Sequence, residues 1–104
     1  MSTSHPVHEL DDTVHQRMRL GILSVLRSVP FVEFTALKRT LALSDGNLAS
    51  HLAALQRAEL VTIDKSDGPN RVRTTVAITP KGRQALDREL KTLEAIIASA
   101  RAGN

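Results

Sequence analysis

Apolar residues in the first part of the chain recur at helical spacing in two segments, separated by a short extended piece. Residues 11–28 predict one continuous helix, whose apolar stripe is formed by Val14, Met18, Ile22, Val25 and Val29. Residues 31–34 alternate weakly, which predicts a short strand. A second, short helix is predicted over residues 35–41, with Thr35 as its N-terminal cap.

A third helical segment lies within residues 44–61, where Leu48, Leu52 and Leu55 form one apolar face. Ser44 is expected to cap this helix, because its hydroxyl can accept a hydrogen bond from an amide of the first turn. Polar residues occupy the other faces of the helix. One side is therefore predicted to pack on a core, and the other is free to make contacts.

The apolar spacing then changes from helical to alternating, which predicts two strands. The first begins at Val61 and the second covers residues 72–78, with turn residues at 66–70, so the pair is a hairpin. Thr79 and Pro80 are typical of a helix start. The final helix is predicted to reach about Ala100, with a stripe formed by Leu86, Leu90, Leu93, Ile97 and Ala100.

The order helix, short strand, helix, helix, hairpin, long helix indicates a mainly α protein with a small β-hairpin, an α+β fold. Two helices joined by a tight turn and followed by a hairpin form the winged helix-turn-helix plan. We expect one domain with three parts: an N-terminal arm outside the core over residues 1–10, the winged helix-turn-helix module over 11–79 and a C-terminal helix over 80–104.

Composition limits the functions that the chain can have. The 14 Lys and Arg against 11 Asp and Glu give a net charge of +3, which permits a polyanionic partner without identifying one. The absence of cysteine excludes disulfides and thiolate metal sites, and two aromatic residues, Phe31 and Phe34, are too few for a platform that stacks single-stranded bases. With no apolar run near the roughly 20 residues of a membrane span and no signal peptide, we expect a soluble cytoplasmic protein without a membrane partner.

Three stretches of the chain resemble the winged-helix regulators of the MarR and ArsR superfamily, especially its short single-domain members. They are HQRMRLGILSVL (His15 to Leu26), LSDGNLASHLAALQRAELV (Leu43 to Val61) and AITPKGRQAL (Ala77 to Leu86). The resemblance covers about residues 14–100. It implies a module that binds double-stranded DNA, with the third helical segment as the recognition helix.

Two residues depart from the pattern of that superfamily. Glu59 stands where such proteins commonly place a glycine after the recognition helix, and a left-handed backbone there would cost a glutamate about 1 kcal/mol. Asp45 puts a negative charge at the start of the helix, which is favourable for the helix dipole but repels nearby phosphate.

The first exposed turns of the recognition helix carry our candidates for DNA reading: Ser44, Gly46, Asn47, Ser50 and His51. Asn47 can pair bidentately with adenine in the major groove, whereas Ser50 and His51 offer weaker bonds that depend on orientation. Gly46 allows a close approach. The alternative is that all of these are ordinary solvated positions of an amphipathic helix.

Basic residues around the recognition helix are candidates for phosphate contacts. On the wing they are Lys65, Arg71 and Arg73, where a guanidinium would enter the minor groove or hold phosphate, as the resemblance implies. On the second helix and at the far end of the recognition helix they are Lys38, Arg39 and Arg57. The alternative is a solvated charged surface, on which Asp64 and Asp67 pair with the wing cations.

The first and last helices supply a candidate dimer interface, formed by Val14, Met18, Gly21, Leu90, Leu93 and Ile97. A subunit this small has little core to spare, so a partner surface for the last helix is expected, and a two-fold dimer would bind a palindromic operator. The alternative is that the last stripe packs entirely on its own domain.

No catalytic constellation emerges from the sequence, so we expect neither an enzyme nor a cofactor. His5, His8 and His15 lack the regular spacing of a preformed helical metal site, and we expect no metal there. The sequence therefore predicts a sequence-specific double-stranded DNA-binding regulator, a homodimeric repressor. The alternatives are a protein interaction module of the same fold and a regulator that senses a small-molecule effector or a metal.

Overall fold

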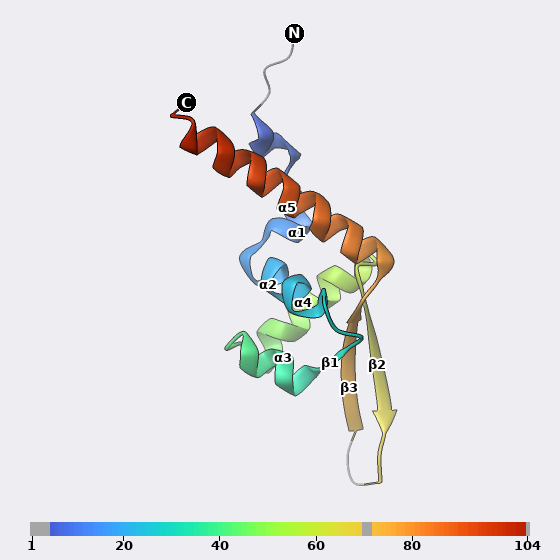
Figure 1. Ribbon diagram of the computed structural model, residues 1–104. Helices are drawn as coiled ribbons and strands as arrows, with labels where there is room; N and C mark the ends of the chain where they lie inside the picture. Colours follow the sequence, from blue (N-terminus) through green and yellow to red (C-terminus); the bar gives the residue numbers. More distant parts are fainter. Residues whose placement is uncertain (1–4, 70–71, 104) are drawn as a thin grey trace.

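The computed structural model describes residues 5–69 and 72–103 and follows the expected order of elements, except that one short helix is added at the start and the first predicted helix is divided in two (Figure 1). The helices are the 3-10 helix η1 (Pro6–Glu9), α1 (Asp12–His15), α2 (Arg17–Leu26), α3 (Phe34–Thr40), α4 (Asp45–Arg57) and α5 (Pro80–Arg101). The strands are β1 (Val32–Glu33), β2 (Val61–Asp67) and β3 (Val72–Ile78). Two helices joined by a tight turn and followed by a hairpin are therefore confirmed.

The three strands form one antiparallel sheet in the order β1-β3-β2. In the hairpin, Val61 pairs with Ile78 at the base and Asp67 with Val72 near the tip, so Ser66 and Asp67, which the sequence predicts in the turn, belong to β2. The short strand β1 adds a third strand to the sheet, because Val32 pairs with Val76 of β3. The hairpin thus extends from the core on a base of three strands.

Every helix from α1 to α5 contributes to one apolar core. Its buried residues are Val14, Ile22, Leu23, Leu26, Leu37, Leu48, Leu52, Leu55, Leu60, Val61, Val76, Ile78, Ala85 and Leu86. The core takes residues of α5 from its first two turns, so this part of the helix belongs to the module with the helix-turn-helix. The rest of α5 projects away from the core on the side opposite to the hairpin (Figure 1).

The first predicted helix is interrupted, which corrects the expectation of one continuous helix over residues 11–28. Gln16 has an extended backbone with ψ of 130°, and its side chain accepts hydrogen bonds from the amides of Met18 and Arg19 at 2.9 and 3.0 Å. It thereby ends α1 and caps α2. The apolar spacing could not reveal this break, because Val14 and Met18 keep the helical interval across it.

The start of α3 also differs from the prediction. The helix begins at Phe34, and its N-cap is Glu33, which makes no side-chain capping bond, so Thr35 is not the cap. Phe34 packs against the core instead, which favours a helix start two residues earlier than a cap at Thr35 would give. After α3 the chain turns through Ala42 in a left-handed conformation (φ 53°) and enters α4.

Of the N-terminal arm, residues 1–4 lie outside the described residues, and η1 contributes nothing to the core but packs against α5 (Figure 1). Glu89 of α5 is 2% exposed, and its Oε1 accepts a hydrogen bond of 2.9 Å from the Asp11 amide. Its Oε2 lies 3.0 Å from His15 Nδ1 and is satisfied when that nitrogen carries a proton. One buried carboxylate therefore fastens the start of the chain to the last helix.

The molecule is elongated, with principal extents of 61 × 24 × 22 Å. Its radius of gyration, 16.1 Å, exceeds the value of about 13 Å that is typical of a compact domain of this length. The excess comes from the hairpin and from the projecting part of α5. Among the helices of the described residues, none combines the length and apolar character needed to cross a membrane.

Candidate nucleic-acid interface

The N-terminal end of α4 is built as the sequence predicts. The Ser44 hydroxyl accepts a hydrogen bond of 3.1 Å from the Asn47 amide and caps the helix. Asp45, the acidic residue that would repel phosphate, lies 2.8 Å from Lys38 Nζ on α3. Lys38 therefore offsets the negative charge at this end of α4 while remaining one of the candidate phosphate contacts.

Two of the candidate readers, and the glycine expected to allow a close approach, occupy the open face of α4. Gly46, Asn47 and Ser50 are exposed, opposite the buried Leu48 and Leu52. A Cβ added to Gly46 would meet nothing within 4 Å, so the surface there is unobstructed. These three residues are placed so that a large partner can reach them.

His51 lies at the edge of that face. It is half-buried on the side of α4 that faces α2, and Arg19 Nε of α2 donates a hydrogen bond of 3.4 Å to His51 Nδ1. Arg19 is not among the residues that the sequence predicts to contact DNA. No local signal in the sequence could have found it, because the contact joins two helices that only the tertiary fold brings together.

The C-terminal end of α4 has a left-handed residue at Glu59 (φ 63°), a conformation that favours glycine. Leu60 N donates to Leu55 O and Glu59 N donates to Gln56 O, both at 2.9 Å, which is the bonding pattern of a Schellman cap. The glutamate thus adopts the conformation of a glycine. Arg57, another candidate phosphate contact, is exposed in the last turn of α4.

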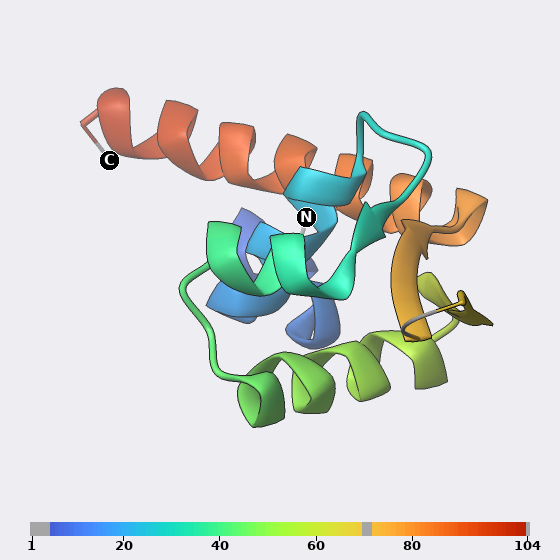
Figure 2. The ribbon, with the colours of Figure 1, turned by 90° about the horizontal axis from the view of Figure 1, so that it is seen from below.

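The hairpin and α4 share an apolar groove of about 390 Å³, which is lined by Phe34, Ala49, Leu52, Ala53, Gln56, Ile63, Lys65 and Thr74. Viewed along the hairpin, the strands lie beside the C-terminal end of α4 (Figure 2). The candidate Lys65 stands in this groove and is exposed. The structure therefore brings the hairpin and α4 together along one surface.

The remaining basic candidates differ in their surroundings. Arg73 is exposed on β3, and its Nε donates a hydrogen bond of 2.7 Å to Glu33 Oε1 at the end of β1. Arg39 is exposed on α3. Arg71 lies outside the described residues. Of the wing cations, Arg73 is thus already paired with a carboxylate for which phosphate would have to compete.

The candidate dimer residues divide into two groups. Val14 is fully buried in the chain's own core, which corrects its assignment to an interface. The backbone at Gly21 is approached by Leu41 of the same chain, whose Cδ2 would lie 3.3 Å from an added Cβ. Leu90 and Ile97 are 41% and 50% exposed on the projecting part of α5, while Met18 and Leu93 are half-buried.

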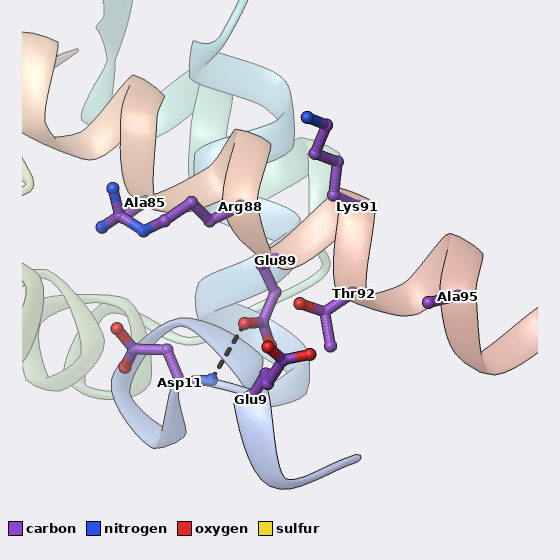
Figure 3. Close-up of a pocket in the computed structure, with 8 residues that line it drawn as sticks. All are labelled: Glu9, Asp11, Ala85, Arg88, Glu89, Lys91, Thr92 and Ala95. Carbon is purple, nitrogen blue, oxygen red and sulfur yellow. Dashed lines mark hydrogen bonds between the residues drawn. The ribbon is translucent and has the colours of Figure 1, made fainter. Parts of the chain in front are cut away.

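A second hollow, of about 410 Å³, lies between the N-terminal segment and α5 (Figure 3). It is lined by Glu9, Asp11, Ala85, Arg88, Glu89, Lys91, Thr92 and Ala95. Its buried carboxylate, Glu89, is already engaged in holding residues 11–15. Within the part of the chain that the structure describes, no three histidine or acidic side chains are grouped so that they could hold a metal ion.

Comparison with known proteins supports a winged helix that binds DNA over nearly the whole chain. The sequence model of the family described as "Winged helix DNA-binding domain" matches residues 18–97. An uncharacterised protein of Methanocaldococcus jannaschii is 43% identical over 68 residues, 65% of this chain and 74% of that protein. The structure of a transcriptional regulator homologue from Pyrococcus horikoshii OT3 aligns with a TM-score of 0.87 at 31% identity, over 93% of this chain and 98% of that one. A putative MarR-family transcriptional regulator from Porphyromonas gingivalis W83 shares the fold, with a TM-score of 0.64 at 20% identity over 99% and 93% of the two chains.

Proposed function

The chain belongs to the winged helix DNA-binding domain family, and from this premise we propose that it acts as a homodimeric repressor that binds a palindromic operator in double-stranded DNA. The family and the matching regulators make it a DNA-binding regulator and not an enzyme. Beyond this, we propose that the protein recognises a specific DNA sequence, that its complex with DNA is two-fold symmetric and that it represses transcription.

The observation that carries the proposal is the open face of α4 beside the hairpin. Gly46, Asn47 and Ser50 are exposed on a helix whose opposite face is buried in the core. A helix held in this way can enter a major groove, where an asparagine pairs bidentately with adenine and serine takes either a donor or an acceptor. Asn47 and Ser50 are the proposed base readers, and Ser44 and Gly46 let the backbone approach closely.

Cations surround this face and are proposed to hold phosphates. Lys38 and Arg39 lie on α3, Arg57 ends α4, and the wing carries Lys65 and Arg73. Phosphate contacts of this kind position a protein on the duplex, while base contacts specify the sequence. A winged helix with five such cations should therefore bind any duplex weakly and its operator tightly.

The homodimer is supported by the projecting part of α5. Leu90 and Ile97 are large apolar residues, about half exposed, on a helix that extends beyond the core. Residues 80–104 are accordingly proposed as the dimerisation helix, whose outer half would pack against a second copy. Two recognition helices related by a two-fold axis would then reach successive major grooves of a palindrome.

Selection from a random duplex library tests the proposal. The selected sequences should contain an inverted repeat, and affinity should fall steeply as salt rises, because several phosphates release counterions. The double variant Asn47→Ala with Ser50→Ala should lose the sequence preference, whereas Gln84→Ala, exposed on α5, should keep it. Adding the protein to a promoter that carries the selected repeat should reduce transcription.

The competing function is an interaction module of the same fold whose recognition helix contacts a protein. That function predicts duplex binding that is absent or insensitive to salt, and no enrichment of an inverted repeat. The salt series and the selection therefore decide between the two functions. Enrichment of a single half-site without its inverted copy would retain DNA recognition but refute the two-fold symmetry.

A further inference from the structure

The contact between Arg19 and His51 determines which nitrogen of the histidine ring carries the proton. Arg19 Nε always bears a hydrogen, and it donates to His51 Nδ1 across 3.4 Å. A neutral imidazole has one N–H, so a ring that accepts at Nδ1 carries its proton on Nε2. Both side chains are half-buried, which limits the competition of water for Nδ1.

We infer that Arg19 is a positioning residue for DNA recognition, because it presents His51 to the duplex as a hydrogen-bond donor through Nε2. The inference rests on the proposed function, in which α4 enters the major groove. His51 lies next to Ser50 and one helical turn after Asn47, so it borders the proposed base readers. A donor at that place selects an acceptor on DNA, either a phosphate oxygen or an acceptor on a base edge such as guanine N7 or O6.

The contact with His51 also places the positive charge of Arg19 beside one flank of α4. At 100° per residue, His51 lies on the opposite flank of the helix from Ala49 and Ala53, which line the groove toward the wing. Lys65 therefore supplies a cation on the wing side, and Arg19 supplies one on the α2 side. A major groove has a phosphate strand along each wall, so a recognition helix with a cation on either flank matches it.

The tautomer of His51 can be measured in the free protein. Proton–nitrogen correlation spectra at about pH 8, above the ordinary titration range of histidine, should show His51 with its proton on Nε2. Arg19→Met, which removes the donor, should shift the ring toward a mixture of tautomers. Arg17→Met is the matched control, because it removes the same charge from an exposed position of α2, and it should leave the ring unchanged. If the unmodified protein carries the His51 proton on Nδ1, the inference is overturned, whereas the proposal that the protein binds DNA still stands.

Duplex binding tests the consequence of that tautomer. His51→Gln places an amide donor near the position of Nε2 and should keep the affinity within about twofold, whereas His51→Asn places it near Nδ1 and should weaken binding about fivefold. Arg19→Met should also weaken binding, by more than Arg17→Met does. In the His51→Asn background Arg19→Met should still remove the cation on the α2 flank, but it should cost less affinity than in the unmodified protein, because the part of its effect that acts through His51 is already lost.

Selection with His51→Asn distinguishes the two acceptors. If Nε2–H donates to a base, the variant should lose the preference at one position of each half-site; if it donates to phosphate, the selected sequence should persist with a uniformly lower affinity. Equal affinity and equal selected sequences for this variant and the unmodified protein would overturn the inference alone. Failure of the unmodified protein to bind any duplex would overturn the proposed function as well.

Discussion

The Thr79 hydroxyl donates a hydrogen bond of 2.7 Å to the carbonyl oxygen of Glu59 and accepts one of 2.9 Å from the Gly82 amide. Glu59 follows the end of α4, and Thr79 is the N-cap of α5. The Thr79 amide adds a third link, a bond of 3.0 Å to the Leu60 carbonyl. One residue thus joins the end of α4, the proposed recognition helix, to the start of α5, the proposed dimerisation helix.

Removal of the Thr79 hydroxyl should destabilise the protein. Thr79→Val keeps the shape of the side chain but leaves the Gly82 amide and the Glu59 carbonyl without this partner, which should cost about 1–2 kcal/mol of unfolding free energy. Thr79→Ser keeps both bonds and should remain within about 0.5 kcal/mol of the unmodified protein. Urea unfolding measures the difference, and equal midpoints for the two variants would contradict the role given to the hydroxyl.

Glycine at position 59 should stabilise the fold. Glu59 has φ of 63°, so Glu59→Gly should relieve about 1 kcal/mol of backbone strain and raise the melting temperature by about 4–8 °C. The ion pair with Lys81, 3.4 Å long and exposed, contributes little that would be lost. Glu59→Ala is the control, since it removes the same pair but keeps the Cβ, and it should give no such gain. A glycine variant that melts no higher than the alanine variant would rule out strain at this residue.

Gly82 and Gly46 should respond in opposite directions to alanine. A Cβ at Gly82 would lie 2.1 Å from the Leu60 carbonyl oxygen, so Gly82→Ala must displace the backbone and should cost about 3 kcal/mol or more. Gly46 is a helical residue with open space around it, and Gly46→Ala should stabilise the protein by about 0.5–1 kcal/mol. Calorimetry would show both. Tolerance of alanine at position 82 would mean that Leu60 and the start of α5 are not packed as closely as the structure has them.

These two glycines illustrate which features of the fold can be predicted from the sequence alone. Helical spacing and turn residues predict α4, the hairpin and α5, because apolar residues recur at the interval that places them on the buried face of each element. Ser44 is predictable as a cap for a different reason: its hydrogen bond to the Asn47 amide is local in the sequence. The close packing of Gly82 on Leu60 is a tertiary contact and leaves no trace in the local pattern.

The errors have both local and tertiary causes. Gln16 interrupts the first helix although the apolar interval continues across it, and Glu89, an acidic residue in an amphipathic helix, reads as a surface position but is buried. Val14 was assigned to a dimer interface because a stripe cannot tell its own core from a partner's. Arg19 was missed because its significance depends on His51, 32 residues away.

Arg73 should contribute to DNA binding in competition with Glu33. Arg73→Ala should weaken binding to all duplexes and make the dependence of log affinity on log salt shallower by about 1, with little change in melting temperature because the ion pair is exposed. Glu33→Gln should strengthen binding, since a neutral amide holds the guanidinium less firmly than a carboxylate does. Fluorescence anisotropy at several salt concentrations measures both variants. An unchanged salt slope for Arg73→Ala would remove this residue from the proposed interface.

Charge on the outer half of α5 should abolish the proposed dimer. Leu90→Arg combined with Ile97→Arg places two guanidinium groups in positions that are half exposed in the single chain, so the fold should survive while association is lost. Gln84→Arg, on the exposed side of the inner half of α5, is the control and should remain dimeric. Sedimentation equilibrium gives the mass of each. A dimeric double variant would place the interface elsewhere.

The extended outline of the molecule affects how such masses should be measured. A chain of 11.3 kDa with axes of 61 × 24 × 22 Å experiences more friction in water than a sphere of the same mass. On a gel-filtration column even a single copy would elute ahead of spherical standards of its own mass and simulate a larger particle. Sedimentation equilibrium and light scattering depend on mass rather than on friction, so they count the copies correctly where elution volume would not.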